Sequence, residues 1–133
     1  MSRPHRKRQG GQETLQAMLA VAFMLLPVLF GIIELGSLIH VWIGQQSAAA
    51  IGARVAGERG EDDALVRDRI GVELRAAGLD PARVQVRITP SYVRWGQPIT
   101  VQLVSRRQLA IPFLFSRDLT LISSYVGRGE VNH

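Results

Sequence analysis

The stretch Leu15–Ile43, LQAMLAVAFMLLPVLFGIIELGSLIHVWI, decides the fold of this chain. It is apolar on every side of a helix and is interrupted by Gln16, Glu34 and a few small or weakly polar residues. As an α-helix rising about 1.5 Å per residue it would extend roughly 43 Å, which exceeds the roughly 30 Å of hydrocarbon in a bilayer. A core helix of this length does not fit so small a protein. The stretch therefore predicts a membrane-spanning helix that tilts or projects beyond the bilayer.

The rest of the chain is long enough for one small domain. Of the 133 residues, about 90 follow the predicted span, which allows a single thin core. Cysteine is absent, which excludes disulfides, lipid-modified cysteine and thiolate metal sites. The net charge of +5 suits an anionic partner, but the arginines are widely spread and do not alternate with aromatic residues as in single-strand binders. We therefore expect no nucleic-acid partner.

Residues 1–10, MSRPHRKRQG, are polar and carry basic residues but no acidic one. The positive-inside rule keeps such a cluster in the cytoplasm, so the C-terminal part is expected on the other side of the membrane. A secretory signal peptide shares the basic start, but its apolar region covers only about 7–15 residues. The longer span favours a permanent anchor. Cleavage by a signal peptidase at the small residues Ser47–Ala50 is the alternative.

Small residues continue the helical pattern beyond the span, to about Ala56. They recur every four positions and form a flat stripe on which a second helix can approach closely. We expect this stripe to pack against a helix of another subunit; the alternative is that it packs against the chain's own sheet. The stripe consists of Gly44, Ala48, Gly52 and Ala56, and an adjoining row consists of Ala49, Ala53 and Gly57.

A charged turn, Gly57–Asp63, then precedes a second, amphipathic helix that ends at Gly78. Asp62 or Asp63 is expected to cap this helix, because a carboxylate can accept the free N–H groups of the first turn. The apolar face of the helix is expected to cover one face of a sheet.

Runs of alternating apolar and polar residues predict a small antiparallel meander after this helix. The apolar run Ile111–Phe115, with two arginines before it, suits a loop at the membrane surface or at a subunit contact, and it suits core filling equally well. The expected strands lie near residues 84–88, 99–103 and 119–125.

The junction before the span, Gln9–Gln16 with the sequence QGGQETLQ, resembles the processing site of type IV prepilins. There a membrane aspartic peptidase cuts after a Gly that follows a basic leader and precedes a long apolar helix. A residue without Cβ lets the backbone lie extended and close in a protease cleft. The resemblance implies cleavage after Gly11, with Gln12 as the new N-terminus.

Several motifs follow one another in a fixed order: an arginine-rich start with Gly, an apolar helix with Pro27, the stretch Phe30–Gly36 with the sequence FGIIELG, Gly52–Arg54 in an Ala-rich helix, and a closing Arg128–Glu130. This order resembles the TadE-like family of pilus-assembly proteins, the minor pseudopilins of tight-adherence (Flp-type, type IVc) pili. The resemblance implies a pilin-like stalk in the bacterial cytoplasmic (inner) membrane. It also implies three kinds of protein partner: other pilin or pseudopilin subunits, pilus-assembly membrane proteins and a prepilin peptidase.

Gln16 departs from the pilin pattern. Pilins of this kind usually carry Glu five residues beyond the cleavage Gly, where its carboxylate is thought to meet the freed amine of a neighbouring subunit. Gln16 can hydrogen-bond but cannot form a charge-assisted pair. Tip subunits of related secretion pseudopilins also lack this Glu, so the resemblance suits a tip or initiator role.

Glu34 is an ionisable residue inside the span, which costs at least about 2.5 kcal/mol on insertion scales. No Lys or Arg lies three or four residues away in the helix, so a partner is expected from another subunit, such as a freed N-terminal amine. The alternative is that Glu34 is protonated or reaches water near the outer interface.

Pro27 removes one helical hydrogen bond, so we expect a kink or a locally melted turn near Phe23–Pro27. No catalytic, cofactor or metal motif is found. The histidines His5, His40 and His133 are not at ligand spacing from one another or from a carboxylate. We therefore predict a protein that is not an enzyme.

Together these patterns predict an α+β protein in which a long N-terminal transmembrane helix, the pilin-like stalk, precedes a short amphipathic helix and a small antiparallel β-meander. The expected parts are a basic cytoplasmic leader (1–11), a transmembrane and continuing stalk helix (12–57) and a small extracytoplasmic domain (58–133). The predicted function is that of a minor pilin or pseudopilin that contacts lipid and helps to assemble or prime a pilus, in the membrane or in the pilus itself. The alternatives are a stand-alone membrane-anchored binding module and a DNA-uptake pseudopilin.

Overall fold

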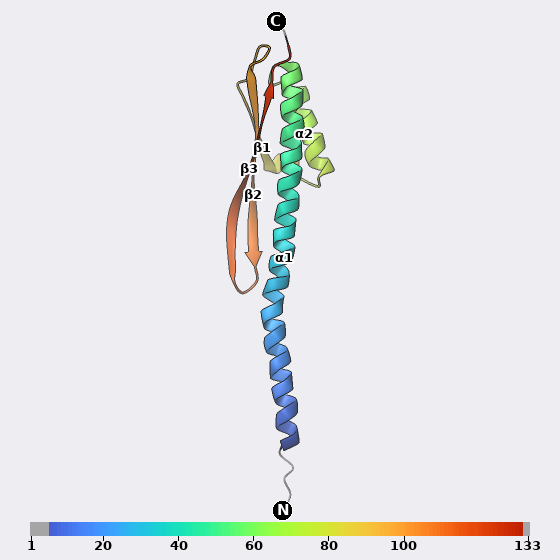
Figure 1. Ribbon diagram of the computed structural model, residues 1–133, viewed down its shortest axis with the longest axis vertical. Coiled ribbons are helices and arrows are strands. Elements are labelled where there is room, and N and C mark those ends of the chain that lie inside the picture. Colours follow the sequence, from blue (N-terminus) through green and yellow to red (C-terminus); the bar gives the residue numbers. More distant parts are fainter. Residues whose placement is uncertain (1–5, 132–133) are drawn as a thin grey trace, which may run out of the picture.

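A computed structural model describes residues 6–131 of the chain, with side chains from residue 10 onward. Figure 1 shows a long helix and a small domain packed around its C-terminal part. This architecture confirms the predicted α+β fold with a long N-terminal helix, a short second helix and an antiparallel sheet. The elements in chain order are α1 (Arg6–Arg59), α2 (Ala64–Ala76), the 3-10 helix η1 (Pro81–Arg83), β1 (Val84–Thr89), β2 (Pro98–Ile111) and β3 (Phe115–Arg128).

The helix α1 is continuous over 54 residues. Pro27 lies within it and the residues on both sides stay helical, so the expected melted turn is absent there, while a bend stays a prediction. The helix starts at Arg6 and so includes the second part of the expected leader; residues 1–5 lie outside the described residues. It ends at Arg59, beyond the expected Ala56. There Gly60, with a φ of 71°, donates its N–H to the Ala56 carbonyl at 2.8 Å and closes the helix.

The sheet has the order β1-β2-β3 with antiparallel pairing throughout. β1 pairs with the first part of β2 only, as far as Ser105. Beyond that point β2 and β3 continue as a two-stranded hairpin to the pair Ile111↔Phe115, so both strands are longer than the sequence predicted. We call 106–110 and 116–120 the hairpin stem and Ile111–Phe115 the hairpin tip. The stem was missed because it carries polar residues on both faces, which removes the alternation that marks a half-buried strand.

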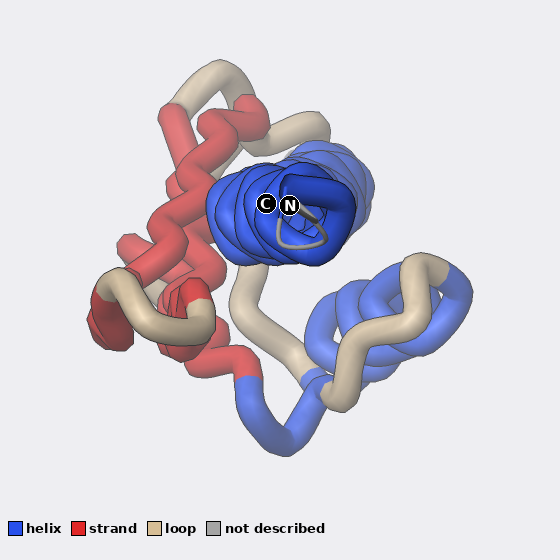
Figure 2. Tube along the Cα trace, turned by 90° about the horizontal axis from the view of Figure 1, so that it is seen from below, coloured by secondary structure: helices blue, strands red, loops and turns tan. Residues whose placement is uncertain are grey.

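The core forms around the C-terminal part of α1. Figure 2, viewed along α1, shows the strands on one side of this helix and α2 on another. The main contacts of α2 are with α1, and those of β2 and β3 also include α1. The apolar face of α2 packs mainly against α1, and its buried side chains share one core with those of the strands. Fully buried core side chains include Val66, Ile70 and Leu74 of α2 and Ile99, Val101 and Leu103 of β2.

Candidate functional site on the stalk helix

Two parts of α1 have opposite surroundings. We call residues 10–40 the lower stalk and residues 41–59 the upper stalk. In the lower stalk, large apolar side chains such as Met18 (65% exposed) and Met24 (75%) are largely uncovered, whereas in the upper stalk Ala48 and Ala56 are fully buried. Within the described residues, α1 is the one helix long and apolar enough to cross a membrane, with a mean hydropathy of 2.4 in its most apolar window. The lower stalk is therefore the candidate site for lipid or for other helices.

The stripe of small residues lies in the upper stalk and is buried in the chain's own domain. A Cβ added to Gly44 would lie 2.7 Å from the Ala77 Cβ, and one added to Gly52 would lie 2.6 Å from Ile70 Cγ1. Ala48 and Ala56 are fully buried in the same core. This corrects the expectation that the stripe packs against a helix of another subunit: the nearest helix is the chain's own α2. Small residues permit close approach whichever molecule supplies the neighbour.

The adjoining row of small residues faces β3 and the closing Arg128–Glu130 motif. A Cβ on Gly57 would lie 2.5 Å from the Arg128 carbonyl oxygen. The Glu130 N–H donates to the Gly57 carbonyl at 2.9 Å. This C-terminal motif therefore fastens the end of β3 to the end of the stalk helix.

Gln45 is a buried polar residue of the upper stalk that the sequence analysis did not single out. Its Nε2 donates to the carbonyls of Leu103 (2.8 Å) and Leu121 (3.0 Å), which belong to β2 and β3, respectively. Its Oε1 accepts a hydrogen bond from Ser105 Oγ at 2.5 Å. Because Gln45 bonds both strands at one level, it sets the height of the hairpin along α1. A polar residue next to a stripe of small residues was the signal that could have revealed it.

The hairpin runs down beside the lower stalk (Figure 1). Its tip reaches the apolar segment, where the rings of Phe113 and Phe23 lie 5.5 Å apart between centroids. A Cβ on Gly31 would lie 3.7 Å from Ile111 Cδ1. The hairpin is thus the part of the domain that extends furthest along the predicted span.

The predicted residues of the lower stalk are not brought together by the fold. Gly11, Gln12 and Gln16 are exposed, and Glu34 is half-buried. Glu34 and Gln16 are separated by roughly 27 Å along the helix, given a rise of about 1.5 Å per residue. Among residues 10–131 no hydrogen bond or ion pair involves the Glu34 carboxylate. A partner for Glu34 from the described part of this chain is therefore missing.

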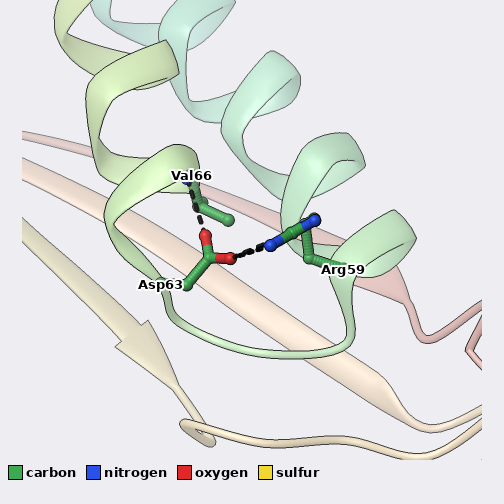
Figure 3. Close-up of polar contacts among 3 residues, drawn as sticks. All are labelled: Arg59, Asp63 and Val66. Carbon is green, nitrogen blue, oxygen red and sulfur yellow. Dashed lines mark hydrogen bonds and ion pairs between the residues drawn. The ribbon is translucent and has the colours of Figure 1, made fainter.

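The junction between α1 and α2 carries a local network of charges (Figure 3). Asp63, one of the two predicted caps, accepts a hydrogen bond from the Val66 N–H at 3.0 Å and so caps α2. It also accepts a hydrogen bond from Arg59 Nη2 at 2.7 Å. The cap bond from Val66, followed by the Arg59 hydrogen bond, lowers the pKa of Asp63 below its ordinary 3.8. Beside it, the hydrogen bonds that Arg67 donates to Asp62 raise the pKa of Arg67. These bonds hold the turn between the two helices.

Comparisons with known proteins bear on the stalk. Neither the curated proteins nor the solved structures gave a match. The family model described as TadE-like protein matches residues 11–54, which comprise nearly all of the lower stalk and most of the upper stalk. This match confirms the resemblance seen in the sequence: over residues 11–54, the stalk helix of this protein is similar to that of TadE-like proteins.

Proposed function

We propose that this protein is a minor pilin or pseudopilin of a tight-adherence pilus, without enzymatic activity, that helps to assemble or prime the pilus. One observation carries the proposal: the lower stalk exposes its large apolar side chains although the rest of the chain forms a packed core. Such a surface is stable only against lipid or against other apolar helices. The match of residues 11–54 to the TadE-like family supports the pilus as the setting.

In this proposal the lower stalk spans the bacterial inner membrane, with the basic leader in the cytoplasm and the domain outside. A prepilin peptidase then removes the leader after Gly11. A Cβ at Gly10 or Gly11 would meet no atom of the described residues within 4 Å, which supports access of a protease to this segment. Two adjacent glycines also weaken the helix at this point, which eases the local unwinding that a protease needs.

Glu34 is proposed to contact another subunit through its carboxylate, which has no partner among residues 10–131. A donor from a neighbouring stalk, including the amine freed at Gln12, would satisfy this carboxylate with a charge-assisted hydrogen bond. Gln16 lacks the charge that shaft pilins use for this purpose. The proposed place of the subunit is therefore at the tip or the start of the pilus.

Mass spectrometry of the protein purified from its own cells tests the processing step. The expected N-terminus is Gln12 in the wild type and in a Gly10→Val control, whereas Gly11→Val keeps the leader. An intact leader in the wild type would instead favour the stand-alone membrane-anchored module.

Crosslinking tests the assembly step. A photo-crosslinking amino acid at Glu34 is expected to capture other pilus components from membranes, and more of them than the same probe at Arg54, which is exposed on the upper stalk. DNA recovered with the protein, and lost when exposed arginines are neutralised, would point to the DNA-uptake alternative.

A further inference from the structure

The hairpin tip, Ile111–Phe115, carries large apolar side chains that the domain leaves uncovered. Phe113 is 81% exposed, Leu114 63% and Phe115 49%. Phe113 has a φ of 67°, a left-handed conformation that glycine adopts without strain and bulky residues rarely take. An aromatic residue is therefore held at the turn, pointing away from the core, where a glycine would fit the backbone better.

The depth of the tip is set by its contacts with α1. Ile111 lies beside Gly31, and Phe113 contacts Phe23. The tip thus extends along roughly 12 Å of the helix axis, given about 1.5 Å per residue. From Gln12 to Gly31 the helix covers roughly 30 Å, which is the thickness of the hydrocarbon layer. A bilayer placed on this segment would have its outer edge near Gly31, and the tip would lie in the outer leaflet.

We propose that the hairpin tip is a second membrane contact, which inserts into the acyl chains of the outer leaflet beside the stalk. The proposal rests on the membrane-spanning lower stalk of the proposed function. The occupant is lipid, not a protein groove, because the tip is continuous with the apolar surface of the span and lies at its depth.

The backbone of the tip suits such an environment. Hydrocarbon does not tolerate unpaired N–H groups. Pro112 has no N–H, the Leu114 N–H donates to the Ile111 carbonyl at 3.1 Å, and Ile111 pairs with Phe115 across the hairpin. Few polar backbone groups at the turn would therefore enter the lipid without a partner.

The hairpin stem, in contrast, suits the headgroup layer. Both of its outer edges are open, since β1 stops at the level of Ser105 and β3 has β2 as its one sheet neighbour. Its side chains include Arg106, Arg107 and Arg117, which match the phosphates of anionic lipids. The change from a polar stem to an apolar tip follows the change from headgroups to acyl chains.

Spin labelling tests this placement, because the chain has no cysteine of its own. Single cysteines are placed at Leu114 (tip), Val28 (span), Asp118 (stem) and Trp95 (68% exposed, in the domain). The full chain is reconstituted at one copy per nanodisc of phosphatidylethanolamine and phosphatidylglycerol. Collisions of each label with oxygen, which concentrates in lipid, are compared with those of a water-soluble nickel complex.

The expected result is that oxygen collisions dominate at 114 as they do at 28, that nickel collisions dominate at 95, and that 118 is intermediate. A label at 114 that behaves like the one at 95, while 28 reports lipid, overturns the tip insertion and leaves the membrane span intact. A label at position 114 that collides with neither oxygen nor the nickel complex also overturns the insertion, in favour of a protein contact. Failure of 28 to report lipid overturns the span, and with it the proposed function.

A second measurement guards against disturbance by the label. Phe113→Trp in a background of Trp42→Phe and Trp95→Phe makes the tip the site of the single tryptophan, which is excited selectively at the red edge of its absorption. Lipids brominated on the acyl chain are expected to quench it more strongly than bromide ions in the water. Stronger quenching by bromide overturns the proposal.

Discussion

The lower and upper stalk belong to one continuous helix, yet the more apolar part is the exposed one. Phe23 in the lower stalk is 64% exposed, whereas Gln45 in the upper stalk is completely buried. Hydrophobicity alone therefore does not decide what is buried in this chain. The upper stalk is buried because small side chains let the domain approach and because Gln45 finds partners on both strands of the hairpin. The lower stalk has no comparable cover and fits a different solvent, the bilayer.

The sharpest test of this difference places the same substitution in both parts. Gly52→Val should destabilise the domain by about 3 kcal/mol or more, because overpacking is costly in a filled core. The added Cβ would lie 2.6 Å and 2.7 Å from two carbon atoms of Ile70. Gly36→Val in the lower stalk should leave stability unchanged, since a Cβ there meets nothing within 4 Å. Chemical unfolding of the full chain in detergent, followed by near-UV circular dichroism, measures both; equal effects would contradict the division.

A second test removes the hydrogen bonds that Gln45 of the upper stalk makes with the hairpin strands. Gln45→Leu should cost about 2 kcal/mol, because buried hydrogen-bonding groups of the hairpin lose their partner. The neighbouring Gln46→Leu is the control. Adding Ser105→Ala to Gln45→Leu should recover part of the loss, since it removes one of the orphaned groups. The absence of such coupling in the unfolding free energies would mean that Gln45 does not set the position of the hairpin.

A smaller effect is expected at the end of the upper stalk, where Asp63 caps α2. Because folding lowers the pKa of this carboxyl, its contribution to stability is present above pH 3.8 and is lost as the pH falls through the lower folded-state pKa. Asp63→Asn keeps a cap but should weaken this acid dependence, and Asp63→Ala should be less stable than Asp63→Asn at neutral pH. Thermal unfolding across acidic and neutral pH measures both. Identical pH profiles for wild type and Asp63→Asn would show that the Asp63 carboxylate does not cause the loss of stability in acid.

The smallest effect is predicted for Ser123, which faces the buried side of the hairpin. Its side chain is completely buried, and its Oγ has no hydrogen-bond partner among the described residues. Ser123→Ala should therefore be neutral or stabilising by up to about 1 kcal/mol, because it removes an unsatisfied polar atom. The exposed neighbour Ser124→Ala is the control. A clear loss of stability would show that the hydroxyl is bonded.

The two parts of the stalk also differ in how well the sequence predicted them. The apolar run Leu15–Ile43 predicted the long helix, and Gly78 stands where the second helix was expected to end. The small-residue stripe was recognised as a packing surface, but its neighbour was misassigned. The spacing of small residues indicates that another helix or strand packs closely on them. It does not indicate whether that neighbour belongs to the same chain or to another subunit.

The length of the hairpin and the depth of its tip were outside the reach of sequence patterns. Alternation is lost in the stem, so the strands were expected to end early. The sequence left three alternatives for the run Ile111–Phe115: a loop at the membrane surface, a subunit contact or a place in the core. It is decided by the register that carries β2 and β3 past the end of β1, and by the contact of Phe113 with Phe23.

By itself, the sequence determined the long apolar helix, the small domain after it and the similarity to TadE-like proteins, because composition and short-range periodicity are local properties. The tertiary structure alone decided that the small-residue stripe serves the chain's own core, that Gln45 joins both strands and that the hairpin runs down along the stalk. Each of these depends on contacts between residues far apart in the chain, such as Gly52 with Ile70 or Gln45 with Leu121, and local patterns do not specify such pairs.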